Sequence, residues 1–134
     1  MNREQRMVRD WHRRFGVVEQ QKPQNVNNAT FALRYDLIRE ELSEFQYAGA
    51  KGDLVGVADA LADLLYVVYG TAVSYGIDME PIFTEVHSSN MSKGNPEVLR
   101  APNGKILKAV NYTPPNIAIL IAEQQKRPLD QIAK

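Results

Sequence analysis

The chain has 134 residues, and its sixteen basic side chains balance sixteen acidic ones, so the formal net charge is zero. That balance argues against binding to nucleic acid polymers, which requires a surplus of positive charge. Cysteine is absent, which excludes disulfides and thiolate metal sites and favours a reducing cytoplasm. No stretch has the roughly 18 apolar residues of a membrane span or the apolar core of a signal peptide. We therefore expect one cytoplasmic domain over residues 1–134, with no membrane partner.

Four helices are predicted in the first two-thirds of the chain from apolar residues at helical spacing and from capping residues. Their expected ranges are 2–15, 28–48, 53–75 and 79–92. Candidate N-caps are Asn27 or Asn28, Asp53 and Asp78, and candidate terminating glycines are Gly16, Gly49, Gly52 and Gly76. The polar segment 17–27 contains Pro23 and is expected to be a loop.

The character of the sequence changes after Gly94, where four prolines between residues 96 and 115 exclude a long helix. Asn103-Gly104 is the favoured two-residue hairpin turn, so residues 97–109 are expected to form a small β-hairpin. A short apolar helix should begin at Asn116, and the tail after about residue 126 is expected to be flexible. The predicted fold is therefore an all-α bundle of four to five helices with a small C-terminal β-hairpin.

The second predicted helix carries two carboxylates on its apolar side. At about 100° per residue, Glu41 and Glu44 lie between Leu33 and Phe45, within an otherwise apolar arc that also contains Arg34. An ionised carboxylate facing a core is costly unless it is paired or bound to a metal, and two such groups one turn apart also repel each other. A divalent cation would remove both problems, and hard oxygen ligands suit Mg²⁺ or Mn²⁺.

The third predicted helix is apolar almost all round, which is typical of a helix at the centre of its domain. Its exception is a narrow stripe of Asp59, Asp63 and Tyr66, in which the two aspartates are four residues apart and point the same way. If the second and third helices pack antiparallel, the glutamate and aspartate pairs can converge on one cavity.

The plainer interpretation of the same residues stays open. A carboxylate at the edge of an apolar arc often reaches solvent or pairs with a nearby cation, here Arg34. An aspartate stripe is usually the solvated face of its helix.

Further polar residues are candidates for contacts to a phosphorylated substrate. Asn90 and Lys93 share one face of the fourth helix, where they could bind a phosphate or a sugar hydroxyl. Lys108, in the expected hairpin, could lie over the substrate, although such lysines are more often edge-strand charges. Neither His12 nor His87 follows a Glu by three residues, which disfavours a carboxylate-bridged redox-metal bundle. His12 is expected to be a surface or packing residue.

Three segments together resemble the all-α nucleoside triphosphate (NTP) pyrophosphatase superfamily. They are Glu40-Glu41-Leu42-Ser43-Glu44, Asp59-Ala60-Leu61-Ala62-Asp63-Leu64-Leu65-Tyr66 and Ser89-Asn90-Met91-Ser92-Lys93. The superfamily includes MazG-like proteins, dimeric dUTPases and phosphoribosyl-ATP pyrophosphohydrolases, and the chain looks most like the small Cof-like MazG-related branch. The resemblance covers roughly residues 5–120 and implies a MazG-like helical bundle that forms a homodimer or homotetramer.

The resemblance also implies an activity, a cofactor and a set of site residues. The activity would be Mg²⁺-dependent hydrolysis of a nucleoside triphosphate between its α- and β-phosphates, with Mn²⁺ as the alternative ion. The metal ligands would be Glu41, Glu44, Asp63 and Asp59, and Glu41 or Glu44 would activate the water. The substrate contacts would be Asn90, Lys93, Arg34, Tyr66 and Lys108.

The sequence departs from the superfamily pattern, Glu-x-x-Glu followed by Glu-x-x-Asp, at one position. Ala60 stands where the second glutamate of that pattern is expected, and Asp59 is the nearest substitute. Asp59 is shorter than glutamate and rotated by about 100° on the helix, so it would present its carboxylate in a different direction. This departure supports the alternative of a catalytically inactive helical relative that binds a nucleotide or a protein.

Overall fold

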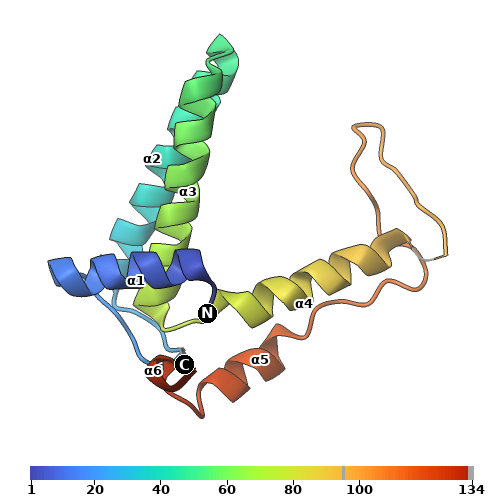
Figure 1. The fold of residues 1–134 in the computed structure, drawn as a ribbon. Coiled ribbons are helices and arrows are strands. Elements are labelled where there is room, and N and C mark those ends of the chain that lie inside the picture. The colour runs from blue at the N-terminus through green and yellow to red at the C-terminus, as the bar shows by residue number, and fades with distance from the viewer. Residues whose placement is uncertain (95, 133–134) are drawn as a thin grey trace.

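The computed structural model describes residues 1–94 and 96–132, and the described part of the chain is helical without strands (Figure 1). The elements are α1 (Arg3–Phe15), α2 (Asn28–Lys51), α3 (Leu54–Tyr75), α4 (Met79–Met91), the short 3₁₀ helix η1 (Ser92–Gly94), α5 (Ile117–Gln124) and α6 (Leu129–Ile132). The all-α prediction is confirmed, and the first four helices begin and end within three residues of their predicted limits.

Side-chain caps fix where the helices begin. Asn27 accepts a hydrogen bond from the Thr30 amide at 2.8 Å, and Asp53 accepts one from the Gly56 amide at 3.0 Å. Three helices end at glycines with positive φ, namely Gly16, Gly52 and Gly76. The second helix runs to Lys51, past Gly49, because Gly52 and not Gly49 adopts the left-handed conformation.

Helices α2 and α3 form a long antiparallel hairpin, and α1 crosses α3 near the base of that hairpin (Figure 1). From the same base α4 points away from the hairpin, and α5 returns beside it (Figure 1). The buried residues gather where α1, the end of α3 and α6 meet, and they include Val8, Val73 and Leu129. The core therefore lies at the base, while the hairpin arm extends beyond it.

The apolar surface of α3 is only partly covered within one chain. Ala60, Gly70 and the residues near the C-terminal end of this helix are buried, but Val55 is 80% exposed and Leu65 is 60% exposed. The expectation that α3 lies at the centre of the domain is therefore wrong for a single chain, because the helix packs along one side only. By length and composition α3 could cross a membrane, so the expectation that no stretch reaches that length is wrong, although one such helix is weak evidence for a span.

The predicted β-hairpin at residues 97–109 is not supported. The chain turns at Gly104, where φ is +83°, but only one isolated antiparallel bridge forms, between Arg100 and Ile106. The hydrogen bonds of this bridge run from the Leu107 amide to the Leu99 carbonyl and from the Ala101 amide to the Lys105 carbonyl. An isolated pair of strands is marginal in water, and no third strand or packed face supports this one.

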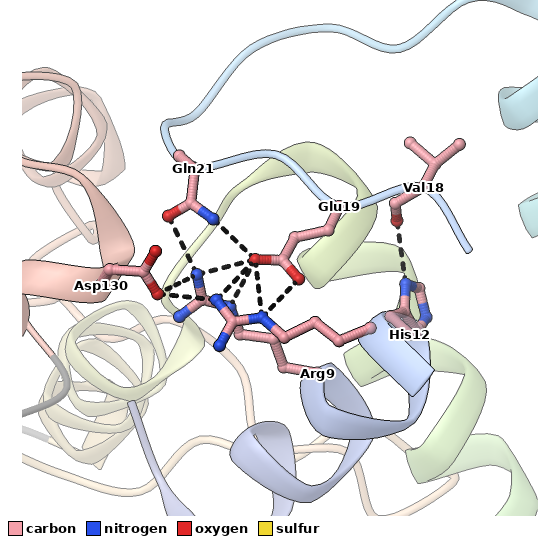
Figure 2. A network of polar contacts seen from close by, with 7 residues as sticks. Arg9, His12, Val18, Glu19, Gln21 and Asp130 are labelled. Carbon is pink, nitrogen blue, oxygen red and sulfur yellow. Dashed lines mark hydrogen bonds and ion pairs between the residues drawn. The ribbon is translucent and has the colours of Figure 1, made fainter. Parts of the chain in front are cut away.

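A network of charges joins α1, the loop 17–27 and α6 (Figure 2). The Arg9 guanidinium is almost fully buried, and it donates to Glu19 and Asp130, each at 2.8 Å. Arg13 donates to the same two carboxylates. Burial alone would raise the pKa of Glu19, but hydrogen bonds from Arg13 and Arg9 outweigh it and hold that pKa below its usual value. The network fixes the loop and α6 against α1, although the sequence had indicated a loose tail.

Candidate functional site

A cavity of about 290 Å³ lies where α1 covers the α2–α3 hairpin. Four residues expected in the functional site line it together, namely Arg34 and Glu41 from α2 and Asp63 and Tyr66 from α3. The α1 helix contributes Val8, Trp11 and His12, and Leu37, Val67 and Gly70 complete the wall. The antiparallel hairpin thus brings four of the nine predicted site residues to one place.

The other two predicted metal ligands line a separate hollow on the hairpin. Glu44 and Asp59 border a more open depression of about 950 Å³, together with Glu40, Ser43 and Tyr47 from α2. Glu44, Asp59 and Asp63 are all exposed, whereas Glu41 is half-buried. Of the four predicted metal ligands, Glu41 is therefore the one most withdrawn from water.

The acidic side chains influence one another across the two helices. Burial raises the pKa of Glu41, and the negative charges of Asp63, Glu44, Glu40 and Asp59 raise it further, in that order. No ion pair in the described part of the chain neutralises Glu41, Glu44, Asp59 or Asp63. The hairpin therefore concentrates negative charge around Glu41.

The chemistry of these carboxylates suits a hard divalent cation, but their side chains do not stand in a ligating arrangement. Carboxylate oxygens are the donors that Mg²⁺ prefers, and the mutual repulsion at Glu41 is what a cation would relieve. However, among residues 1–94 and 96–132 no three acidic or histidine side chains stand at a spacing that could hold a metal. The side chains of the glutamates and aspartates would have to rotate toward one another for ligation.

Ala60, at the position of the missing glutamate, is 2% exposed and lies on the buried side of α3. A longer acidic side chain at this position would point into the contact with α2. Asp59, one residue earlier, faces the open hollow instead. Of these two neighbouring residues, Asp59 is therefore the one whose side chain borders a hollow.

Arg34 does not pair with Glu41, which was one plain interpretation of its place in the sequence. In the described part of the chain it forms no ion pair, and its one side-chain contact of hydrogen-bond type joins Nη2 to His12 Nε2 at 3.4 Å. His12 is 1% exposed, and its Nδ1 lies 2.9 Å from the Val18 carbonyl oxygen (Figure 2). His12 is thus a buried residue of the cavity wall rather than a surface residue.

Sequence reasoning missed the contribution of α1 to this site. The available signal was the spacing of Val8, Trp11 and His12, which places them on one face of α1, where Val8 and His12 are buried and Trp11 borders the cavity. Nothing in the sequence showed that this side would lie over Arg34, since that requires the crossing of α1 over the hairpin (Figure 1).

The remaining predicted substrate contacts lie away from both hollows. Asn90 is near the end of α4 and Lys93 is in η1, and α4 packs mainly against η1 and α5. The Lys108 ammonium lies 4.6 Å from the centre of the Tyr112 ring. Within one chain these three residues are therefore separated from Glu41 and Asp63, because α4 leads away from the hairpin (Figure 1).

Comparison with known proteins connects this arrangement to one family. Residues 8–90 match the family model described as phosphoribosyl-ATP pyrophosphohydrolase, a segment that runs from α1 to the end of α4. An uncharacterized protein of Acanthamoeba polyphaga mimivirus is 39% identical over 77 residues. That match covers 54% of this chain but 31% of the viral protein, so the chain spans about a third of its curated relative.

Proposed function

Because the chain belongs to the phosphoribosyl-ATP pyrophosphohydrolase family, we propose that it hydrolyses a nucleoside triphosphate between the α- and β-phosphates. The products would be a nucleoside monophosphate and pyrophosphate. The observation that carries this proposal is the set of carboxylates around Glu41, beside a cavity that contains the buried Arg34. Residues 8–90 of the family match include all of them. A cytoplasmic housecleaning role and membership of the Cof-like branch are further parts of the proposal.

The proposed cofactor is Mg²⁺, with Mn²⁺ as the alternative. Glu41, Glu44 and Asp63 would hold it, and Asp59 would serve in place of the glutamate that Ala60 replaces. When bound, the ion would neutralise charge on the phosphate oxygens during P–O bond cleavage. This role is supported because the described part of the chain has no ion pair to these carboxylates, namely Glu41, Glu44, Asp59 and Asp63.

Glu41 is the better candidate for the group that accepts a proton from water. It is half-buried and lines the cavity, and burial and the neighbouring carboxylates raise its pKa. A carboxylate withdrawn from water in this way is a suitable general base. The water oxygen would form the new bond to phosphorus as its proton moves to the Glu41 carboxylate, and the P–O bond to the departing pyrophosphate would break. Glu44 is more exposed, which suits a ligand that closes around the substrate.

A second copy of the chain would complete the site. The exposed apolar residues of α3, among them Leu61, Leu65 and Val68, are suited to a homodimer or homotetramer interface. In one chain Asn90, Lys93 and Lys108 lie away from the carboxylates. We propose that the α4 and η1 segments of another copy bring these residues to the phosphates.

The test is a panel of nucleoside triphosphates and diphosphates with Mg²⁺ or Mn²⁺, with detection of released pyrophosphate. We expect metal-dependent pyrophosphate release by the wild-type chain and its loss in Glu44→Gln. Glu97→Gln, which changes an exposed glutamate in the loop after η1, is the matched control and should keep full activity. Turnover by Glu44→Gln at the wild-type rate would remove Glu44 from the site.

The second candidate function is that of an inactive relative that binds nucleotides or a protein, and the observation that favours it is Ala60. This alternative predicts that nucleotides bind without any pyrophosphate release in the whole panel. The same panel therefore separates the two functions, provided that binding is measured in parallel by calorimetry.

A further inference from the structure

The Arg34 side chain is a buried cation with no anionic partner in the described part of the chain. The residue is 5% exposed, and its Nε is fully buried without a hydrogen-bond partner among the residues described. Burial lowers the pKa of Arg34, and no ion pair to a carboxylate in the described part of the chain opposes that effect. A buried charge without a partner is costly, so its retention beside a cavity points to a ligand that accepts its hydrogen bonds.

His12 holds this guanidinium in place as a hydrogen-bond acceptor. Its Nδ1–H donates to the Val18 carbonyl oxygen, which leaves Nε2 with a lone pair directed at Arg34 Nη2. Burial and the Arg34 charge both lower the pKa of His12, which favours this neutral form. Gly70 leaves room for the pair, since a Cβ there would lie 3.1 Å from both Arg34 Nη1 and His12 Nε2.

The walls of the cavity suit a flat ring better than a phosphate. Trp11 and Tyr66 both line it, with their ring centres 6.2 Å apart and nearly perpendicular, and Leu37 and Val67 add aliphatic surface. A volume of about 290 Å³ is at the small end of ligand pockets, so it suits one ring system rather than a whole nucleotide. Glu41 and Asp63 border the same cavity and would repel a phosphate that is not shielded by a cation.

We propose that this cavity is the base-binding subsite, in which Arg34 donates to two adjacent acceptors on one edge of the base and His12 positions it. This inference rests on the proposed function, since it assigns the base of the same nucleotide substrate. It makes Arg34 a specificity-determining residue and His12 a positioning residue. Trp11 becomes one wall of the subsite.

The donor pattern of Arg34 selects among bases. A guanidinium carries five N–H donors and no acceptor, and one of them is directed at His12. Two neighbouring donors therefore match cytosine, through O2 and N3, or guanine, through O6 and N7. Uracil and adenine place a donor next to each acceptor on these edges. We expect cytosine or guanine nucleosides to bind roughly 5- to 150-fold more tightly than uracil or adenine ones.

The chain provides its own probe for this test, because Trp11 is its single tryptophan. Full-length protein without metal is titrated separately with cytidine, guanosine, uridine, adenosine and inorganic pyrophosphate, and tryptophan fluorescence is recorded. We expect saturable quenching by cytidine or guanosine at concentrations at which uridine, adenosine and pyrophosphate have no effect. Equal binding of all four nucleosides, or quenching by pyrophosphate alone, would overturn the proposal.

Variants then separate base recognition from folding. Arg34→Lys keeps the charge but loses the paired donors, so the preference among nucleosides should vanish, whereas Arg100→Lys in the exposed loop should leave it intact. His12→Leu should abolish the preference, and His12→Gln, which keeps an acceptor for Arg34, should retain part of it. If His12 has only a structural role, His12→Leu lowers the melting temperature and leaves the preference unchanged, which contradicts our assignment.

Gly70→Ala tests the same subsite without replacing Arg34 or His12. The added Cβ would crowd the Arg34–His12 contact, so nucleoside binding should weaken while helical circular dichroism is unchanged. Nucleoside binding is measured without hydrolysis. If the protein binds cytidine or guanosine but releases no pyrophosphate, only the proposed function is contradicted. If it releases pyrophosphate but shows no preference among the nucleosides, only the base-binding subsite is contradicted.

Discussion

Replacing Gly76 with alanine should destabilise the protein much more than replacing Gly16, although both residues end a helix at a positive φ of 70° and 66°. The left-handed conformation costs a side chain with a Cβ about 1–2 kcal/mol at either position. A Cβ at Gly16 would have no neighbour within 4 Å. At Gly76 it would collide with the Lys22 carbonyl group, lying 2.6 Å from the carbonyl carbon.

The collision is costly because the loop cannot easily retreat. Backbone hydrogen bonds from Gln20 to Val73 and from Gln24 to Tyr75 hold the loop 17–27 against the end of α3. Overpacking of this kind typically costs a further 1–3 kcal/mol or so. Gly16→Ala should therefore lose about 1–2 kcal/mol and Gly76→Ala about 2–5 kcal/mol of unfolding free energy.

The assay is urea denaturation followed by far-ultraviolet circular dichroism, with both variants and the wild type at one protein concentration, because association would shift the apparent stability. The difference between the two variants isolates the contact with the loop. Equal losses would refute the reasoning, since they would mean that residues 17–27 do not lie against α3.

The remaining predictions concern the charge network, the exposed face of α3 and the C-terminal helix. Glu19→Gln should cost about 3 kcal/mol near neutral pH, because it removes one of the two carboxylates that pair with the buried Arg9. The folded state lowers the pKa of Glu19, so Glu19 stabilises the fold at pH values above its ordinary pKa of 4.5. This stabilisation is lost as the pH falls through the folded-state pKa of Glu19. Thermal melts of Glu19→Gln should therefore lack this part of the acid dependence. Leu65→Glu should shift the protein toward monomer in analytical ultracentrifugation, whereas Val110→Glu, in an exposed loop, should not. Leu129→Ala should cost about 2–5 kcal/mol in urea denaturation, because Leu129 is fully buried; a loss below about 0.5 kcal/mol would mean that α6 is not packed.

Local signals in the sequence were sufficient for most of the fold. Asn27, Asp53 and Asp78 cap the helices that they were expected to cap, and the glycines at the helix ends adopt positive φ where the helices stop. These are interactions within a few residues, which sequence reasoning can follow. The short helix α6 was not predicted, because four residues carry little periodicity and its position depends on Arg9 and Arg13, more than a hundred residues away.

The candidate site could be predicted only in part for the same reason. Residue spacing placed Glu41 and Asp63 on facing sides of two helices, and an antiparallel hairpin was enough to bring them to one cavity. The packing of α1 over Arg34 depends on a crossing between distant segments, so the role of His12 could not be seen. Asn90 and Lys93 match the superfamily in sequence, but in one chain they lie away from the carboxylates because α4 leads away from the hairpin. The sequence does not predict the direction of α4.

The most direct test of the central claim is the rate of pyrophosphate release with Mg²⁺ by wild type and Glu41→Gln, with the best nucleotide of the panel. If Glu41 accepts the proton of the attacking water beside the carboxylates that hold the ion, the kcat of Glu41→Gln should be roughly 10²- to 10⁴-fold below that of the wild type. The helical content should stay the same. A Glu41→Gln enzyme that retains the wild-type kcat would contradict the claim that this half-buried carboxylate is the centre of the chemistry.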